Sequence, residues 1–485
     1  MSLWNKKELL ESLKSQIIKY NFASIEEIDN ISKVTIDSRK SDKNSLFIAL
    51  KGENQDGNSF LPQIVHNGCT IAIISDEAIY KNYQNNEIKL ILVKDGFASL
   101  NLLAQYSRNR SQALIIAITG SVGKTTSKEM LKLALSQYKK TFANEGNLNN
   151  HIGMPLSLVN LDISYEVAIF EMGMNHSGEI SALSEIAKPH IAIITNIGTA
   201  HLEFFKSQQE IALAKAEIFN HLTNFKGQIP QIILNGDSEF YKFLKEIAIK
   251  KHAQNVKISS YGISNNNDYN IIKIDDEKFN EVKIVATINK NNLNQSCEYQ
   301  LNTNNQAIIY NSLIALAVID NIGLEPKIGL VKLLEFKLTA GRGLLSEILV
   351  DNKNITIIDD SYNSSLTSID AGLKNASKIK KSLHKKRLVA IIGDMLELGE
   401  KSTELHLQAM RLISQHSVDL AILVGKETNN ASQYLKNIKY FNFHNSIDAS
   451  QSILQYIEND DIIYIKGSRG IKLELIVNKL KSATS

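Results

Sequence analysis

A strand-like run that leads directly into a glycine-rich turn constrains the fold of this chain more than any other feature. The run is Ile115-Ile116-Ala117-Ile118, and the turn is Thr119-Gly120-Ser121-Val122-Gly123-Lys124-Thr125-Thr126. A short β-branched run of this kind predicts a buried strand, and the apolar spacing after residue 126 predicts a helix. Backbone N–H groups at the start of such a helix bind phosphate. The sequence therefore predicts a phosphate-binding loop at the end of a buried strand.

The spacing of this turn differs from that of the common phosphate loop. The motif Gly-x-x-x-x-Gly-Lys-Ser/Thr would need a glycine at position 118, which is Ile118. The shorter form still places Lys124 where a lysine contacts the β- and γ-phosphates of a nucleotide, and Thr125 where a hydroxyl ligates Mg²⁺. The spacing argues against a GTPase switch.

Length, charge and cysteine content exclude several classes of protein. The 485 residues are enough for about three domains. A net charge of only +3, with no block of Lys or Arg, argues against a nucleic-acid or anionic-membrane partner. Cys69 and Cys297 are the only cysteines, so we expect no disulfide framework and a reducing cytoplasm. The first twenty residues predict an amphipathic helix rather than a secretory signal, and no apolar run is long enough to span a membrane.

Apolar runs alternate with helical patterns, and this order predicts an α/β protein of three domains. Residues 1–98 form a small α/β unit, residues 99–337 a central unit with a parallel sheet, and residues 338–485 a doubly wound, Rossmann-like unit. Residues 97–108 predict a helix between the first two. The expected strands are 33–36, 45–50, 70–74, 89–93, 115–118, 167–171, 191–195, 231–235, 355–359, 388–392, 421–424 and 462–465. Alternating residues between 256 and 302 predict an antiparallel ribbon or a small extra sheet.

Three charged residues of the central unit are candidates for chemistry. Glu171 ends the strand 167–171, and the carboxyl ends of parallel strands form the ligand crevice of such a sheet. Mg²⁺ prefers oxygen ligands, so Glu171 is a candidate ligand, although a strand-end acid can also be simply solvated. His201 follows the next strand, although a lone histidine is often structural. Lys215 lies on a predicted helix, where composition alone favours a solvated lysine.

Four short motifs of the last unit place charged residues at strand ends or among glycines. They are Gly341-Arg342-Gly343, Asp359-Asp360-Ser361-Tyr362-Asn363, the 393–399 segment with Asp394, and Lys466-Gly467-Ser468-Arg469-Gly470. Asp360 and Asp394 follow strands at one rim of the predicted sheet, where ligands bind. The forked guanidinium of an arginine suits a phosphate or a carboxylate. Each motif alone also occurs as an ordinary turn.

Taken together and in this order, the motifs resemble those of the Mur ligase family, in the type that adds a dipeptide. The resemblance covers nearly the whole chain. It also includes Asp37-Ser38-Arg39 in the first unit, Asn149-Asn150-His151 after the phosphate loop, and Asn311 in the central unit. One difference is visible: the family continues Asp-Ser-Tyr-Asn with Ala-Asn-Pro, whereas Ser364-Ser365-Leu366 follows here.

The resemblance implies a cytoplasmic, monomeric ligase that uses ATP and Mg²⁺ to join D-alanyl-D-alanine to UDP-N-acetylmuramoyl-tripeptide for peptidoglycan synthesis. It implies ATP binding by Gly120, Ser121, Val122, Gly123, Lys124, Thr125, Thr126, Asn311, Arg342 and Asp360. It implies Mg²⁺ ligands at Thr125, Glu171, His201 and a carbamylated Lys215, with Lys124, His201 and Lys215 as catalytic residues. It implies substrate binding by Asp37, Ser38, Arg39, Asn149, Asn150, His151, Asp394 and Arg469.

Two other functions are weighed against this one. The sister ligase that adds a diamino acid to UDP-muramoyl-dipeptide carries Asp-Asn-Pro-Arg in its last domain, but the last proline here is Pro326. A nucleotide-gated switch that reads guanine would carry Asn-Lys-x-Asp, which this sequence lacks. Both comparisons favour the dipeptide-adding ligase.

Overall fold

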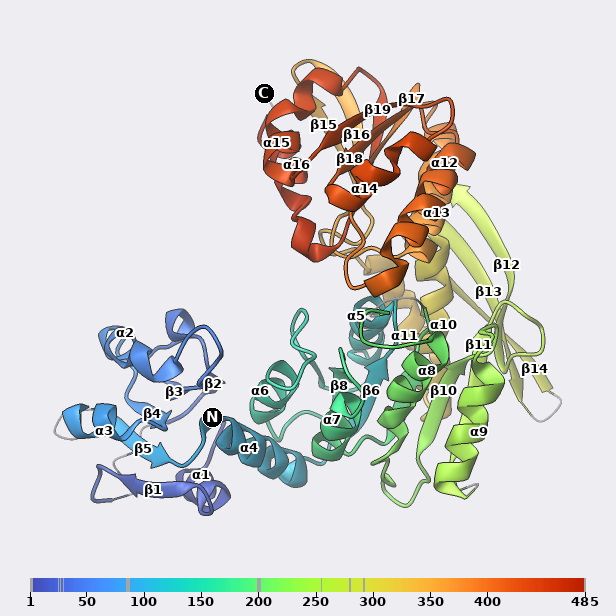
Figure 1. Cartoon of the computed structure of the whole chain (residues 1–485). Coiled ribbons are helices and arrows are strands. Elements are labelled where there is room, and N and C mark those ends of the chain that lie inside the picture. The colour runs from blue at the N-terminus through green and yellow to red at the C-terminus, as the bar shows by residue number, and fades with distance from the viewer. Residues whose placement is uncertain are drawn as a thin grey trace.

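The chain folds into three α/β regions that follow one another in sequence (Figure 1). The computed structural model describes residues 3–24, 26, 28, 30–83, 88–198, 202–253, 255–278, 281–290 and 293–483. In Figure 1 the first region is blue, the central region runs from teal to yellow, and the last region, orange to red, lies above the central one. Each region contains its own sheet, in agreement with the α/β fold predicted from the sequence.

The first region has a five-stranded sheet in which only one strand is antiparallel. Its spatial order is β1 (Ile17–Tyr20), β5 (Lys89–Val93), β4 (Ile71–Ile74), β3 (Ser45–Ile48) and β2 (Lys33–Thr35). The pair β1–β5 is antiparallel, and the other pairs are parallel. The helices are α1 (Lys6–Leu13), α2 (Leu61–His66), α3 (Glu77–Tyr83) and α4 (Gly96–Arg110).

The central region is built on a nine-stranded sheet with the phosphate-loop strand near its middle. The order is β14 (Leu293–Leu301), β13 (Glu281–Lys290), β12 (Tyr269–Lys278), β11 (Lys257–Gly262), β10 (Gln231–Asn235), β9 (Ile191–Ile194), β6 (Leu114–Thr119), β8 (Val167–Glu171) and β7 (Thr141–Ala143). After β6 the chain continues to β7 on one side and later returns to β9 on the other. The strand order therefore reverses at β6, which is where parallel sheets bind ligands.

Alternate side chains of the central strands pack against helices on opposite faces of the sheet. Ile116 and Ile118 pack with α5 (Lys124–Leu135) and α10 (Gln306–Asn321), whereas Ile115 and Ala117 belong to the core on the other face. The remaining helices of this region are α6 (Gly153–Val159), α7 (Glu179–Ala187), α8 (Gln208–Ala216), α9 (Tyr241–His252) and α11 (Pro326–Leu330). Burial on both faces explains why the strands are almost continuously apolar.

The last region has a six-stranded sheet with one antiparallel edge strand. Its order is β15 (Leu344–Val350), β16 (Lys353–Asp360), β20 (Asp461–Lys466), β17 (Arg387–Gly393), β18 (Leu420–Val424) and β19 (Lys439–Phe443). Only the β15–β16 pair is antiparallel. The helices are α12 (Leu366–Ser382), α13 (Ser402–Gln415), α14 (Lys426–Ala431), α15 (Ser446–Ser452) and α16 (Glu474–Ser482).

The structure corrects the sequence prediction in two places. The predicted N-terminal helix ends at Leu13, and Ile17–Tyr20 form strand β1, because alternate residues of this segment are exposed as it pairs with β5. The antiparallel ribbon predicted between 256 and 302 is present as strands β12 to β14, but the alternative of a separate sheet is wrong. Strand β11 pairs in parallel with β10 and joins the antiparallel strands β12 to β14 to the central sheet.

The central and last regions meet through main-chain atoms as well as side chains. The Glu203 N–H donates a hydrogen bond to the Glu397 carbonyl at 3.0 Å. Gly399 has φ +55°, and a Cβ built on it would lie 3.1 Å from the Glu203 Cα. The boundaries at 98 and 337 stay predictions. No helix in the described part of the chain is long and apolar enough to cross a membrane.

Candidate active site

The phosphate loop connects the carboxyl end of β6 to the start of α5, as the sequence predicts. Gly120 has φ +150°, and a Cβ there would lie only 1.9 Å from Thr195 Oγ1. Gly123 has φ +88°, and its Cβ would lie 3.0 Å from Asn311 Nδ2. Among the residues that the structure describes, no side chain caps α5. The first N–H groups of this helix are therefore suited to phosphate.

The rest of the loop is held by the segment that follows β9. The Ser121 N–H donates to the Asn196 carbonyl at 2.8 Å, and Ser121 Oγ accepts from the Gly198 N–H at 2.9 Å. Thr195 Oγ1 donates to the Val122 carbonyl at 2.6 Å. The Val122 side chain is exposed and Thr126 is half-buried. These bonds fix the loop on the sheet. Asn311 of α10 lies beside the loop at Gly123, and its contact with adenine stays a prediction.

Lys124 begins helix α5, and its ammonium donates to the Gly120 carbonyl at 2.7 Å. Burial lowers the pKa of Lys124, the Glu171 carboxylate opposes this effect, and Arg342 adds to it. Arg342 belongs to the last region of the chain. The charges of the two side chains therefore act on one another across the two regions.

The next residue, Thr125, lies against the carboxylate that ends β8. Thr125 Oγ1 donates to Glu171 Oε2 at 2.7 Å, and Asn149 Nδ2 donates to Glu171 Oε1 at 2.7 Å. Glu171 is 1% exposed, so it is not the solvated acid that strand-end position alone allows. A hydroxyl and a carboxylate oxygen side by side at a phosphate loop are ligands that Mg²⁺ accepts.

Lys215 of α8 is buried, with 1% of its surface exposed. Burial lowers its pKa well below the ordinary value, and the charge of Lys124 lowers it further. Among the described residues, Lys215 has no recorded hydrogen bond or ion pair. The expectation from composition that Lys215 is solvated is therefore wrong. His201, its expected neighbour in the metal site, lies outside the described residues, and among the rest no three His, Cys, Asp or Glu side chains gather as a metal site.

Asp360 lies at the carboxyl end of β16, at the rim where its sequence position puts it. Its Oδ2 accepts from the Lys466 ammonium at 2.7 Å and from the Tyr464 hydroxyl at 3.3 Å. Burial raises the pKa of Asp360, and Lys466 opposes that rise. Lys466 also donates to the Asn363 carbonyl at 2.8 Å, so it holds the segment after β16 in place.

Two arginines of the last region lie over one aromatic ring. The Arg342 guanidinium carbon is 4.2 Å from the centre of the Tyr362 ring, and that of Arg469 is 5.5 Å from it. Such cation–ring contacts orient a guanidinium while leaving its N–H groups free for an anion. The Arg469 side chain is 63% exposed, and its Nη1 lies 3.4 Å from Glu474 Oε1. The Gly341 and Gly470 motifs are thereby brought together.

Asp394 has a different environment from Asp360, although both lie at the same rim. Its carboxylate accepts from the N–H groups of Glu427 and Thr428 at 3.1 and 2.8 Å, and from Thr428 Oγ1 at 2.9 Å. A Cβ on Gly425 would lie 2.4 Å from this carboxylate. Asp394 therefore fixes the start of α14, and a direct contact with substrate stays a prediction.

The residues expected to bind the nucleotide sugar lie on two regions. Asp37 and Arg39 form an ion pair at 2.8 Å, and Ser38 Oγ donates to Gln63 Oε1 at 2.6 Å. In the central region, Asn150 Oδ1 accepts from the Gly153 N–H at 2.8 Å and so begins α6. His151 packs its ring against Phe97, with ring centres 5.6 Å apart. Asn149 lies nearest the phosphate loop, since it donates to the same Glu171 carboxylate as Thr125.

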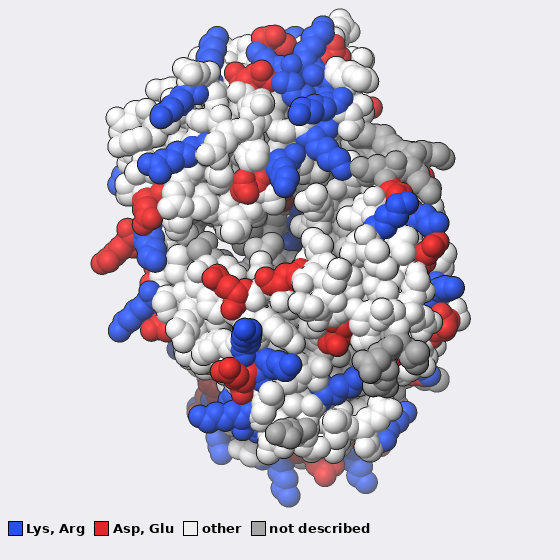
Figure 2. All heavy atoms as spheres, turned by 90° about the vertical axis from the view of Figure 1, so that its right-hand side faces the viewer, with Lys and Arg blue, Asp and Glu red and all other residues white. Residues whose placement is uncertain are grey.

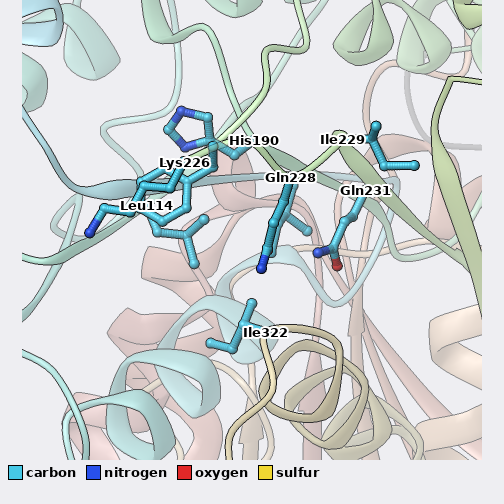
Figure 3. A pocket seen from close by; sticks show the side chains of 9 residues that line it. Leu114, His190, Lys226, Gln228, Ile229, Gln231 and Ile322 are labelled. Carbon is cyan, nitrogen blue, oxygen red and sulfur yellow. The ribbon is translucent and has the colours of Figure 1, made fainter.

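A small pocket lies at the opposite end of the central sheet from the phosphate loop (Figure 3). It is lined at the amino ends of β6, β9 and β10 by Leu114, His190, Ile191, Phe225, Lys226, Gln228, Ile229, Gln231 and Ile322. Ligands of parallel sheets bind at the carboxyl ends of the strands, so this pocket is not the active site. A hollow is visible at mid-height in Figure 2, on a face where basic and acidic side chains are mixed.

Sequence reasoning missed three residues that shape the site. Lys466 pairs with Asp360, Asn144 accepts from the Glu171 N–H at 2.8 Å, and Lys128 donates to the carbonyls of the segment after β7. Lys128 carries a local signal, since it lies one helical turn after Lys124 on the face that packs on the sheet. Lys466 belongs to the motif 466–470, but its pairing with Asp360 carries no local signal, and neither do the contacts of Asn144, because these partners are distant in sequence.

Comparison with known proteins gives one family for the whole chain. The Mur ligase middle domain matches residues 118–319, the glutamate ligase domain of Mur ligases matches residues 346–469, and the Mur ligase family catalytic domain matches residues 30–99. The UDP-N-acetylmuramoyl-tripeptide–D-alanyl-D-alanine ligase of Rickettsia prowazekii is 35% identical over 477 residues, 98% of this chain and 99% of that one.

Two further relatives agree with this result. The ligase of the same name from Bacillus subtilis is 32% identical and covers 93% of both chains. A crystal structure of MurF from Acinetobacter baumannii has a TM-score of 0.81, 28% sequence identity and 99% coverage of both chains. The chain therefore belongs to the Mur ligase family, and within it to the MurF type.

Proposed function

We propose that this chain uses ATP to join D-alanyl-D-alanine to UDP-N-acetylmuramoyl-tripeptide in peptidoglycan precursor synthesis. The full-length relatives named for this reaction support the proposal. The observation that carries it is the loop at the end of β6, where Lys124 and the Thr125–Glu171 pair lie beside the N-terminus of α5. The cytoplasmic location and the monomeric state belong to the same proposal.

The reaction proceeds in two chemical steps. The terminal carboxylate of the tripeptide attacks the γ-phosphorus of ATP, and ADP leaves with the electrons of the broken P–O bond. The amine of D-alanyl-D-alanine then attacks the carbonyl carbon of this acyl-phosphate, and phosphate leaves the tetrahedral intermediate as the amine loses a proton. Lys124 and Arg342 supply positive charge where negative charge develops on the phosphoryl oxygens.

Thr125 and Glu171 fit a Mg²⁺ ion, because both present oxygen atoms and both lie at the phosphate loop. When bound, the ion would neutralise charge on the β- and γ-phosphates. The Glu171 carboxylate is held from its other side by Asn149, so one oxygen keeps its orientation while the other faces Thr125. Asp360 and Asn311 are proposed to contact the ribose and the adenine.

Lys215 is proposed to carry a carbamate. A neutral amine reacts with CO₂ to form the carbamate, and the lowered pKa of Lys215 favours that neutral amine. The modification converts a buried neutral amine near Lys124 into an anion that offers two oxygen atoms to a metal. His201 completes this second metal site in the proposal.

The uridine nucleotide and the peptide are proposed to lie between the first and central regions. Asp37, Ser38 and Arg39 would contact the nucleotide sugar, and Asn149, Asn150 and His151 would contact the end nearer the phosphate loop. Asp394 and Arg469 are assigned to the incoming dipeptide. Arg469 fits this role best, since its guanidinium is exposed and oriented by Tyr362.

Steady-state turnover with two acceptors tests the function. UDP-muramoyl-tripeptide and UDP-muramoyl-dipeptide are each offered D-alanyl-D-alanine, meso-diaminopimelate or L-lysine. We expect efficient turnover only with the tripeptide and D-alanyl-D-alanine, because a site built for the distal carboxylate leaves its donors unpaired with a single amino acid. Preference for the dipeptide acceptor with a diamino acid would instead identify the sister ligase, and ADP release that ignores the amine would identify a nucleotide switch.

A further inference from the structure

Lys128 is a fully buried lysine beside the proposed metal site, and none of the steps above uses it. It lies on α5 one turn after Lys124, and its side chain is 0% exposed. Its ammonium donates to the carbonyls of Asn144 and Gly146, the latter at 3.1 Å, and lies 3.2 Å from Glu129 Oε1. Lysine is almost never fully buried unless it is paired, and here all three N–H donors have a partner.

The two carbonyls belong to the segment 144–149, which we call the β7 loop because it follows strand β7. This loop is bound to the end of β8 at both of its ends. Asn144 Oδ1 accepts from the Glu171 N–H at 2.8 Å, and the Asn149 carbonyl accepts from the Gly173 N–H at 2.8 Å. From this loop, Asn149 Nδ2 donates to Glu171 Oε1 at 2.7 Å.

Besides Lys128, bonds within the β7 loop hold its middle: the Leu148 N–H donates to the Glu145 carbonyl at 3.1 Å, and the Asn149 N–H donates to the Asn147 carbonyl at 2.7 Å. Gly146 has φ +52°, and no atom lies within 4 Å of a Cβ built on it. Within the loop, the Asn144 amide donates to the Leu148 carbonyl at 2.7 Å. Loss of the Lys128 ammonium would leave the carbonyl of the buried Asn144 without this donor and would release the exposed Gly146, which favours a rearranged loop. Asn149 would then move away from Glu171.

We propose that Lys128 is a positioning residue for the metal carboxylate. It holds the β7 loop so that Asn149 fixes the orientation of Glu171 for Mg²⁺. The proposal rests on the proposed function, because it concerns Glu171 as a ligand. Groups that orient a metal ligand typically change metal affinity by about 10- to 100-fold when they are removed.

Binding of Mn²⁺ to the full-length protein with ADP, followed by electron paramagnetic resonance, tests this role without turnover. Lys128→Met removes the ammonium and keeps an unbranched chain, and we expect its Mn²⁺ affinity to fall by about 10-fold. Asn149→Ala should show a similar loss. The double variant should lose no more than Asn149→Ala, since Lys128 acts through Asn149. The control is Lys132→Met, at an exposed position of the same helix, which should bind Mn²⁺ like the unaltered protein.

The outcomes separate this role from the proposed function. Unchanged Mn²⁺ affinity in Lys128→Met, or additive losses in the double variant, would overturn the role of Lys128 and leave the metal site intact. An unaltered protein that bound no Mn²⁺ with ADP would overturn the metal site and this role with it.

A second pair of measurements covers the case in which Lys128→Met does not fold. Lys128→Gln keeps an amide that can donate to the two carbonyls, and we expect an intermediate affinity and faster amide hydrogen exchange over residues 145–149. Unchanged affinity in Asn149→Ala would by itself refute the proposal.

Discussion

Lys124, Lys128 and Lys215 lie around the end of β6, and each amine has a different set of partners. Lys124 donates to the carbonyl of its own loop, Lys128 is saturated by two carbonyls and a carboxylate, and Lys215 has no recorded partner among the described residues. A saturated amine holds structure, whereas one with spare donors can bind a ligand. By this criterion, Lys124 and Lys215 are suited to bind ligands, and Lys128 is suited to hold the structure.

Lys124→Ala should abolish ligation while leaving the fold intact. Among the described residues its one hydrogen bond is to the Gly120 carbonyl, so little stability depends on it, whereas the proposed function places it against the charge of the transferred phosphoryl group. Loss of such a contact typically lowers turnover by about 10²-fold or more. Turnover and thermal unfolding are measured together, with Lys132→Ala as the control. Retention of a tenth of the activity would refute the assigned role.

Lys215 should be found as a carbamate. Protein equilibrated with ¹³C-bicarbonate is expected to show a carbamate carbon signal by ¹³C NMR, and Lys215→Ala should lose both this signal and nearly all turnover. Lys250→Ala, on the exposed side of α9, should keep both. Full activity of Lys215→Ala in bicarbonate-free buffer would show that the amine has no role in the reaction.

At the scale of elements, the sequence predicts the buried strands well and the edge strands poorly. Strands such as β6 and β8 are apolar throughout because helices cover both faces. The edge strands β7, β15 and β19 were missed because they are short or half-exposed and carry no continuous apolar run. In the site, Lys124, Thr125 and Glu171 could be predicted because each lies at or just after the end of a strand. The contacts of Asn144 and Lys466 could not be predicted, because their partners are distant in the sequence.

The junction of α4, β6 and β9 should make stability depend on pH. His190 precedes β9, and its Nδ1 accepts from the Ile115 N–H at 2.8 Å while Arg108 of α4 lies 3.1 Å from Nε2. The Ile115 N–H and the Arg108 guanidinium are both donors. A ring that is protonated on both nitrogens would therefore find no hydrogen-bond acceptor at either of them. Burial and, secondarily, the charge of Arg108 lower the pKa of His190 to about 3.

The sign of this effect follows from proton binding. The unfolded chain takes up a proton on His190 below about pH 6.5, whereas the folded chain stays neutral until about pH 3. The contribution of His190 to the free energy of unfolding is therefore fully present above pH 6.5. It falls as the pH drops, by roughly 2 kcal/mol at pH 5. Urea unfolding at pH 7 and pH 5 should show a smaller pH effect in His190→Gln than in the unaltered protein. His66→Gln, at an exposed position, should show the same change in the free energy of unfolding between the two pH values as the unaltered protein. An equal change in the unaltered protein and both variants would contradict the prediction.

At the scale of the whole molecule, we expect catalysis to require that the last region meets the central one. Lys124 and Thr125 come from one region, and Arg342, Tyr362 and Asp360 come from the other. An acyl-phosphate hydrolyses readily, so a site closed by two regions protects it from water. Turnover should therefore respond to changes at the contact between the regions, even far from the phosphate loop.

Gly399→Val should lower turnover by weakening this contact. A β-branched residue is strained at φ +55°, and its Cβ would press on the Glu203 backbone. We expect at least a tenfold loss of turnover and a larger radius of gyration by small-angle X-ray scattering with ATP and substrates. Gly323→Val provides the control, since Gly323 has φ +77° but no atom within 4 Å of its Cβ position. Equal losses in both variants would point to backbone strain alone.

The hydrogen bond from the Glu203 N–H to the Glu397 carbonyl has a consequence for how such proteins diverge. Because both atoms belong to the main chain, almost any amino acid at either position preserves the bond, and mutation of neighbouring side chains leaves it unaffected. A relative that shares only 28% of its residues can still superpose at a TM-score of 0.81. Proline at position 203 is the exception, since it has no N–H, and a lineage that acquired it would have to evolve another way of holding the two regions together.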